Sequence, residues 1–257
     1  SQNPRIILFF IQEKTIIINE SIAGEIKTSP FKQYFYPELK KFDDFECEEF
    51  EDYESFQRKR EIGENPDIIC QLIRKDSIDE FLEYVKRNQI NIKSEEESMI
   101  KNSIFETNTL LNSYINFAQY AAFYGSLNII SALKSADCDY LDSFLWKYAI
   151  HSNNSELIYY LDQNVRKPTD SFKECFDEAI KCHHNQLAVF IKDNLIRNKK
   201  TSNSPSCFNY FNYLMFPENI SGYSTIFTFC WRDYPSIVEI EFEKVYDKNL
   251  MENIFFF

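Results

Sequence analysis

The residues that could carry chemistry are few, and four of them lie in one short stretch. The chain has three histidines and seven cysteines. Two of each, Cys175, Cys182, His183 and His184, lie within ten residues. Thiolate and imidazole are zinc ligands, but a closed tetrahedral site needs four converging ligands, and no second pair stands at a suitable spacing. We therefore expect no metal site, no cofactor and no stoichiometric zinc in the purified chain.

Nucleophilic and acid–base catalysis are also disfavoured. Cys182 falls near the predicted end of a helix, where the helix dipole disfavours a thiolate. The run over 43–54 holds eight acids and no base, without an apolar pocket that would raise the pKa of one of them. We interpret this run as a solvated acidic loop or helix face, with a docking site for a basic partner as the alternative. We expect no catalytic residue; an enzyme assembled around 182–184 is the minor alternative.

Composition excludes several other classes of function. The four glycines stand too far apart for either common glycine-rich phosphate cradle. The net charge of −12 repels phosphate backbones, so nucleic acid is not an expected partner. The apolar run over 6–11 is too short to span a membrane. The cysteines are odd in number and form no C-x-x-C pair. We expect a reduced, cytoplasmic protein without membrane contact or a small-molecule substrate.

The elements that must position these residues change in character along the chain. Two β-branched and aromatic runs, 6–11 and 15–18, are separated by three polar residues, which predicts a short β-hairpin. A helix is expected to follow over 21–26. From 64 to 195 the pattern predicts an almost wholly helical chain arranged in antiparallel pairs.

A helix–turn–helix pattern recurs in this part of the chain. Three copies, at 117–133, 145–161 and 175–191, each have a short helix with a small residue, a polar turn and an amphipathic helix. Outlying copies lie at 68–85 and 226–242. The small residues are Ala121, Ala149 and Ala179, and the predicted turns lie at Asp76, Gly125, Asn153 and His183. We expect the three alanines to be buried where two helices approach closely.

Five such units predict a mainly α fold. Its architecture would be a solenoid of degenerate helix–turn–helix units behind a small N-terminal hairpin and helix segment. The expected organisation is an N-terminal segment over 1–60, a helical repeat domain over 61–197, a linker over 198–206, and a C-terminal aromatic segment with the last helical pair over 207–257. Trp146 and Trp231 lie in apolar patterns and are expected in the core.

The turn pattern A-x-x-x-(G/N)-x-x-x-(I/L)-(I/V)-x-x-L resembles the ankyrin repeat. No copy has the T-P-L-H start, and the spacings differ from 33 residues. Longer strings resemble an uncharacterised domain that precedes ankyrin arrays in proteins of parabasalid protists. These strings are KREIGENPDIICQLIRKDSIDEFLEYV, SIFETNTLL, YAAFYGSLNII, LWKYAIHSNNSELI and EAIKCHHNQLA. The resemblance covers about 9–243, and we expect the array itself to be absent here. The stretch KTIIINESIAGEIKTSPFKQYF resembles the strand–helix opening of BTB/POZ domains.

The resemblance implies a non-enzymatic protein–protein interaction module, with a structural subunit of a larger intracellular assembly as the alternative. In ankyrin-like units the end of each first helix faces the concave groove. The row of residues at those positions is Arg74, Lys75, Phe123, Tyr124, His151, Ser152, Lys181 and Cys182. Of these we expect six to bind a partner: Arg74, Lys75, Phe123, Tyr124, His151 and Lys181. Cations and aromatics gathered on an acidic chain predict a partner protein with a locally acidic surface.

Overall fold

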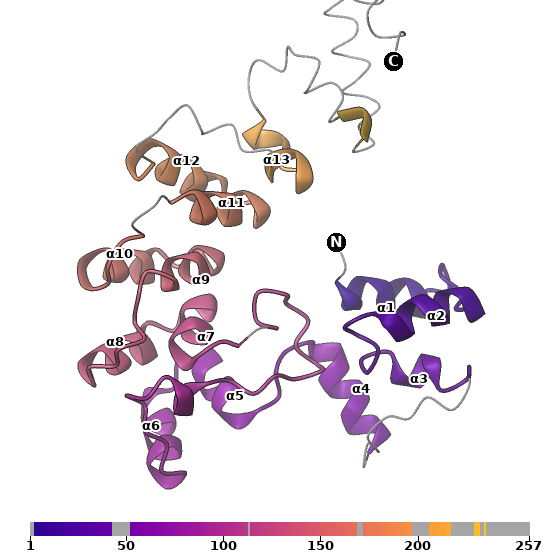
Figure 1. Cartoon of the computed structure of the whole chain (residues 1–257), viewed down its shortest axis with the longest axis horizontal. Helices are drawn as coiled ribbons and strands as arrows, with labels where there is room; N and C mark the ends of the chain where they lie inside the picture. Colours follow the sequence, from indigo (N-terminus) through magenta and orange to yellow (C-terminus); the bar gives the residue numbers. More distant parts are fainter. Residues whose placement is uncertain are drawn as a thin grey trace, which may run out of the picture. The chain divides into compact units, whose positions relative to one another are not determined.

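The computed structural model describes residues 3–42, 52–112, 114–168, 172–196, 206–216, 229–231 and 234. Within these ranges the regular elements are helices and none is a strand (Figure 1), which confirms the mainly α expectation. No helix in the described part is long and apolar enough to cross a membrane. Most of the acidic run and of the expected linker lie outside the described residues. The chain divides into two compact units, Ser1–Tyr148 and Ala149–Phe257.

In its described residues, the first unit begins with four helices. They are α1 (Pro4–Gln12), α2 (Glu20–Thr28), α3 (Tyr36–Leu39) and α4 (Tyr53–Ile62). The predicted hairpin is therefore wrong, because the run over 6–11 lies inside α1. Asn3 accepts a hydrogen bond from the backbone N–H of Arg5, and Pro4 stands in the first turn; both are helix-start signals. Leu8 is buried in one apolar cluster with Tyr34 and other residues, and this packing on one helix face overrides the strand propensity of the run.

Two helix pairs follow in the same unit. They are α5 (Ile68–Arg74) with α6 (Ile78–Arg87), and α7 (Phe117–Tyr124) with α8 (Leu127–Ser135). α7 contacts α5 and α8 contacts α6, so the second pair stacks on the first (Figure 1). The connection over 88–116 holds only a short 3-10 helix, Glu96–Ser98, in its described part. The prediction of an almost wholly helical chain is wrong for this connection.

The second unit continues the pattern of paired short helices. Its described elements are α9 (Leu145–Ser152), α10 (Ser155–Asn164), α11 (Lys173–Lys181), α12 (Asn185–Asn194), α13 (Ser206–Asn209) and a 3-10 helix, η3 (Tyr213–Met215). The first four residues of α9 belong to the first unit. Trp146 is 1% exposed, as predicted, but Trp231 is 77% exposed and its prediction is wrong. Phe229, two residues before Trp231, is buried instead, and residues two apart on a helix do not share a face.

The predicted turn positions are confirmed by backbone geometry. Asp76, Gly125, Asn153 and His183 all have left-handed φ angles, between 52° and 75°. Glycine, aspartate, asparagine and histidine are the residue types that tolerate this conformation best. The three predicted small residues are each 0% exposed. Local sequence therefore identifies where these four helix pairs reverse and which small residues are buried.

Left-handed positions outside the predicted turns include Gln89, Asp137 and Phe211. Phe211 has φ of 55°, four residues after the buried Cys207, and the backbone N–H of Asn212 donates to the carbonyl oxygen of Cys207 at 2.9 Å. The same hydrogen bond joins Ser126 to Ala121 at 2.8 Å. Such bonds satisfy carbonyl groups left open at a helix end.

A side-chain hydrogen bond repeats together with these turns. The residue directly after the left-handed position donates to a backbone carbonyl at the end of the first helix of the preceding pair. We call this contact the turn-to-helix link. Its examples are Ser126 Oγ to Ile73 O at 2.6 Å, His184 Nε2 to His151 O at 3.0 Å, and Asn212 Nδ2 to Ile180 O at 2.9 Å. Each link therefore joins one helix pair to the next within a compact unit.

Candidate functional site

One hollow of the first unit lies at the ends of α4 and α5. Its volume is about 600 Å3. It is lined by Lys59, Ile62, Glu64, Pro66, Gln71, Arg74, Lys75 and Tyr124. Three of the residues predicted to bind a partner, Arg74, Lys75 and Tyr124, are therefore brought together. Lys59 and Lys75 are exposed and Ile62 is 57% exposed, so the hollow presents cations beside an apolar surface.

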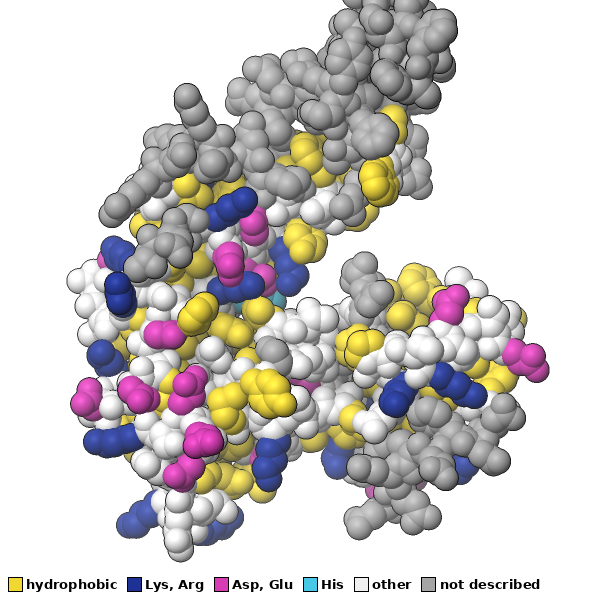
Figure 2. Space-filling model, viewed as in Figure 1, with side chains coloured by type: hydrophobic (Ala, Val, Ile, Leu, Met, Phe, Trp, Pro, Cys, Tyr) yellow, Lys and Arg dark blue, Asp and Glu magenta, His cyan; other side chains and the backbone are white. Residues whose placement is uncertain are grey.

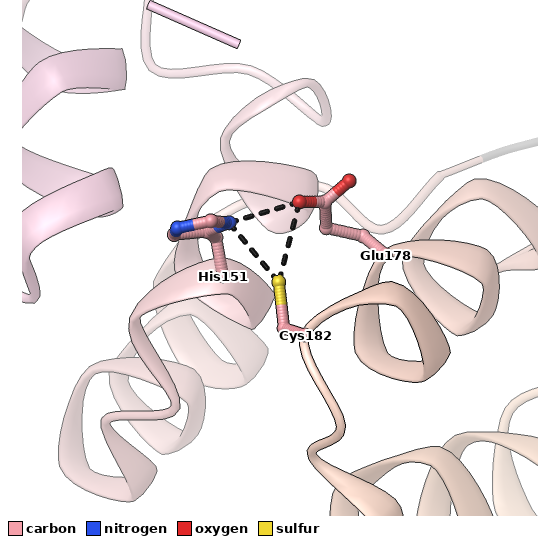
Figure 3. A group of neighbouring side chains, drawn as sticks. All are labelled: His151, Glu178 and Cys182. Carbon is pink, nitrogen blue, oxygen red and sulfur yellow. Dashed lines mark hydrogen bonds and ion pairs between the residues drawn. The ribbon is translucent and has the colours of Figure 1, made fainter. Parts of the chain in front are cut away.

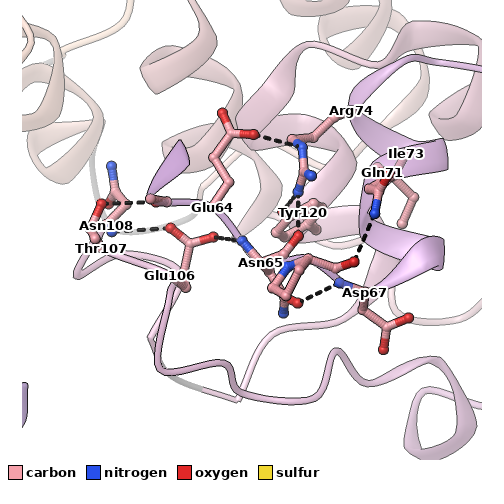
Figure 4. Close-up of polar contacts among 12 residues, drawn as sticks. Glu64, Asn65, Asp67, Gln71, Ile73, Arg74, Glu106, Thr107, Asn108 and Tyr120 are labelled. Atoms are coloured by element: carbon pink, nitrogen blue, oxygen red, sulfur yellow. Dashed lines mark hydrogen bonds and ion pairs between the residues drawn. The ribbon is translucent and has the colours of Figure 1, made fainter. Parts of the chain in front are cut away.

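Arg74 is fixed at the hollow by several groups (Figure 4). Its Nε lies 3.0 Å from a carboxylate oxygen of Glu64, and its Nη1 donates to the backbone oxygen of Asn65 at 2.8 Å and to the hydroxyl of Tyr120 at 2.6 Å. Its guanidinium carbon lies 5.7 Å from the ring centre of Tyr124, a cation–π contact. Burial acts to lower the pKa of Arg74, but Tyr120 and Glu64 outweigh burial and the pKa is raised. Arg74 is therefore a permanent, oriented cation.

The connection over 88–116 contacts the segment between α4 and α5, which forms part of the hollow (Figure 4). The carboxylate of Glu106 is buried and accepts hydrogen bonds from the backbone N–H groups of Asn65 at 3.2 Å and Asn108 at 3.1 Å. The hydroxyl of Thr107 donates to the carbonyl oxygen of Gly63 at 2.9 Å. Burial raises the pKa of Glu106 despite its hydrogen bonds. These contacts fix the segment between α4 and α5, which carries Glu64 of the hollow.

The other residues of the predicted row have different surroundings. Phe123 is 7% exposed and belongs to the core of the first unit. His151, Ser152, Lys181 and Cys182 belong to the second unit. All four are partly exposed. The hollow therefore collects the first-unit members of the predicted row, with the exception of Phe123.

A second cluster of reactive side chains lies in the second unit (Figure 3). His151, in the last turn of α9, points toward the end of α11, which carries Glu178 and Cys182. His151 Nδ1 lies 2.9 Å from Glu178 Oε1 and 3.2 Å from Cys182 Sγ, and Sγ lies 3.5 Å from the same Oε1. We call these three residues the His–Glu–Cys cluster.

The pKa values and contacts of this cluster disfavour nucleophilic catalysis by Cys182. Burial and the carboxylate of Glu178 raise the pKa of the Cys182 thiol to about 12. Burial acts to raise the pKa of Glu178 as well, but the hydrogen bond with His151 and the charge of Lys181 outweigh it and lower that pKa. Both Cys182 and Glu178 contact the same imidazole nitrogen, whereas in a cysteine–histidine–acid triad they contact different nitrogens. The thiol therefore lacks a general base that is oriented by the acid.

Sequence reasoning grouped the wrong residues around Cys182. Cys175 is buried, His183 Nε2 contacts the backbone oxygen of Tyr210 at 3.0 Å, and His184 forms a turn-to-helix link. Glu178 was missed, although it stands one helical turn before Cys182, at a spacing that places two side chains on one helix face. His151 was placed in the same predicted row as Cys182, but no metal or catalytic role was assigned to that pair.

Comparison with known proteins gives no match. No family model, curated protein or solved structure matches the chain. The resemblance to the parabasalid domain therefore stays a prediction.

Proposed function

We propose that this chain is a non-enzymatic protein–protein interaction module, built as a solenoid of degenerate ankyrin-like units. The repeated left-handed turn and the turn-to-helix link support the repeat architecture, because the same contact recurs within each compact unit: once between pairs of the first unit and twice in the second. The resemblance to the domain that precedes ankyrin arrays in parabasalid proteins supports the same architecture. A cytoplasmic location belongs to this proposal and agrees with the thiol state of the described cysteines.

The observation that carries the proposal is the hollow at the ends of α4 and α5. Its cations, Lys59, Lys75 and the fixed Arg74, lie beside Tyr124 and the exposed side chain of Ile62. Arginine and aromatic residues contribute most strongly at protein interfaces, and Glu64 neutralises only part of this positive charge. We infer that the hollow binds an acidic segment of a partner protein which also inserts an apolar side chain.

The distribution of charge favours such a local contact over nucleic-acid binding. Acidic and basic side chains are interspersed on the face drawn in Figure 2, and the whole chain carries a net charge of −12. A phosphate backbone needs an extended basic surface. A short acidic peptide needs only the few cations of the hollow.

The proposal can be tested with peptides selected from a random display library on the immobilised chain. The selected peptides are expected to contain acidic residues beside an apolar residue. Reversing both exposed charges, with Lys59→Glu and Lys75→Glu, should weaken peptide binding by at least about tenfold, the equivalent of about 1.4 kcal/mol. Calorimetry or fluorescence anisotropy would measure the dissociation constants.

The matched control is the double variant Lys86→Glu and Lys134→Glu. These lysines are exposed and also lie in the last turns of their helices, but they do not line the hollow. The control makes the same change in net charge and should retain peptide binding. Equal weakening in both double variants, or selected peptides without acidic residues, would contradict the proposal.

A further inference from the structure

We propose that the His–Glu–Cys cluster of the second unit binds one zinc ion, with His151 Nδ1, Glu178 Oε1 and Cys182 Sγ as ligands. This inference is independent of the proposed function, since it concerns a different unit and a different ligand. It replaces the expectation of a metal-free chain, which rested on Cys175, Cys182, His183 and His184. The tertiary structure assembles a different set of residues around Cys182.

The chemistry of the three donors fits zinc. The cluster offers one imidazole nitrogen, one thiol and one carboxylate, and all three ligand atoms lie within 4.8 Å of one another. Zinc accepts nitrogen, sulfur and oxygen ligands in one site, whereas magnesium and calcium select oxygen ligands. A site with three protein ligands and one open position is a common zinc arrangement.

The distances between the three donor atoms are close to those of a zinc-bound site. In a tetrahedral site with metal–ligand distances of about 2.0–2.3 Å, the donor atoms lie about 3.3–3.6 Å apart. The Sγ–Oε1 distance of 3.5 Å already has this value. The Nδ1–Sγ distance of 3.2 Å and the Nδ1–Oε1 distance of 2.9 Å are a few tenths of an ångström shorter. Small side-chain rotations would therefore admit the ion.

The surrounding residues hold the donors in place. Glu178 and Cys182 stand one turn apart at the end of α11, where the backbone N–H of Cys182 donates to the carbonyl oxygen of Glu178 at 2.9 Å. His184 holds the backbone of His151 through its turn-to-helix link. Lys181 Nζ lies 3.5 Å from Glu178 Oε2, the oxygen that is not used as a ligand. Such outer contacts orient ligands and support metal affinity.

The burial pattern leaves one side of the cluster accessible. The side chain of Glu178 is 4% exposed, while that of His151 is 22% exposed and Cys182 is partly exposed. The ion can therefore enter from the side of His151 and Cys182. Its fourth position would be taken by water.

The test uses the full chain stripped of metal by a chelator and then titrated with Zn2+. Atomic mass spectrometry after gel filtration should find one zinc per chain. Titration with Co2+, a spectroscopic probe of the same site, should produce a thiolate-to-cobalt charge-transfer band. Cys182→Ser, which preserves side-chain size, should abolish this band. Cys182→Ser, His151→Ala and Glu178→Gln should each weaken Zn2+ binding by at least about tenfold, because loss of outer-shell contacts alone costs about 10–100-fold.

Two exposed residues supply matched controls. Cys230→Ser and His183→Ala remove a thiol and an imidazole outside the cluster, and both variants should retain the Co2+ band and the zinc affinity. Circular dichroism would check that each variant is folded. If Glu178→Gln unfolds, the test relies on the conservative variant Cys182→Ser. Absence of stoichiometric zinc in the wild-type chain would overturn the proposal. So would unchanged binding in Cys182→Ser, or an equal loss in Cys230→Ser.

Discussion

At the scale of single residues, the small residues of the predicted repeat are fully buried, and we expect them to lie where two helices approach too closely for a larger side chain. Ala121 and Ala179 are each 0% exposed. We expect Ala121→Leu and Ala179→Leu each to lower the free energy of unfolding by about 1–3 kcal/mol through overpacking. Urea denaturation followed by circular dichroism would measure the change. Gln186→Leu, at an exposed position of α12, is the control and should be almost neutral. Unchanged stability of both alanine variants would show that the repeat register is wrong.

Glu106 is the residue for which the structure implies a dependence of stability on pH. Burial raises the pKa of its carboxyl in the folded state, so the folded chain holds this proton more tightly than the unfolded chain. The contribution of Glu106 to stability is therefore fully present below its ordinary pKa of 4.5 and falls as the pH rises through the raised value.

This dependence can be isolated by comparing the wild type with Glu106→Gln from about pH 4 to about pH 7, a range that begins near the ordinary glutamate pKa. The stability of the wild type relative to the variant should decrease as the pH rises. Glu80→Gln, at an exposed position of α6, should show no such trend. A relative stability that increases with pH would contradict the assignment.

At the scale of elements, Asp76 has two functions at once. It adopts the left-handed φ of 52° that ends α5, and its carboxylate accepts hydrogen bonds from the backbone N–H groups of Asn128 at 3.0 Å and Ile129 at 2.9 Å in the first turn of α8. It therefore caps a helix of the next pair. Satisfying these otherwise open donors stabilises the stacking of the two pairs.

Substitutions at Asp76 can separate the cap from the backbone conformation. Asp76→Gly removes the cap but suits the left-handed conformation, and we expect it to cost about 0.5–2 kcal/mol. Asp76→Ala should cost about 1–2 kcal/mol more, because alanine disfavours this conformation. Asp76→Asn keeps one acceptor oxygen and should have the smallest effect. Thermal and urea unfolding would rank the three variants, and a glycine variant as stable as the wild type would show that the cap contributes nothing.

At the scale of the whole molecule, the repeated links predict that a destabilising substitution affects mainly the helix pair that carries it and its neighbours. In repeat proteins each unit depends mainly on its nearest neighbours. Ala179→Leu should therefore accelerate hydrogen exchange most strongly in α11 and α12 and much less in α5 and α6. Mass spectrometry of exchanged peptides would measure this, with Gln186→Leu as the control. Equal acceleration in all helices would indicate one cooperative unit instead of a repeat array.

The sequence by itself determined four of the turns, at Asp76, Gly125, Asn153 and His183. A left-handed position follows a small buried residue by four positions at Gly125, Asn153 and His183, because both requirements are local: the turn needs a particular backbone conformation and the contact needs a small side chain. The turn at Phe211 was not predicted, because phenylalanine is an unusual residue at φ of 55° and no local preference indicates a turn there.

Only the tertiary structure decided which side chains meet. His151 is separated from Glu178 by 27 residues and from Cys182 by 31, so the His–Glu–Cys cluster depends on how α9 packs near the end of α11. The same holds for α1, whose β-branched residues become helical because Leu8 is buried with the side chains of α2 and α3. Composition and spacing specify local conformation, whereas burial and proximity across long separations arise from packing, which overrides local preference.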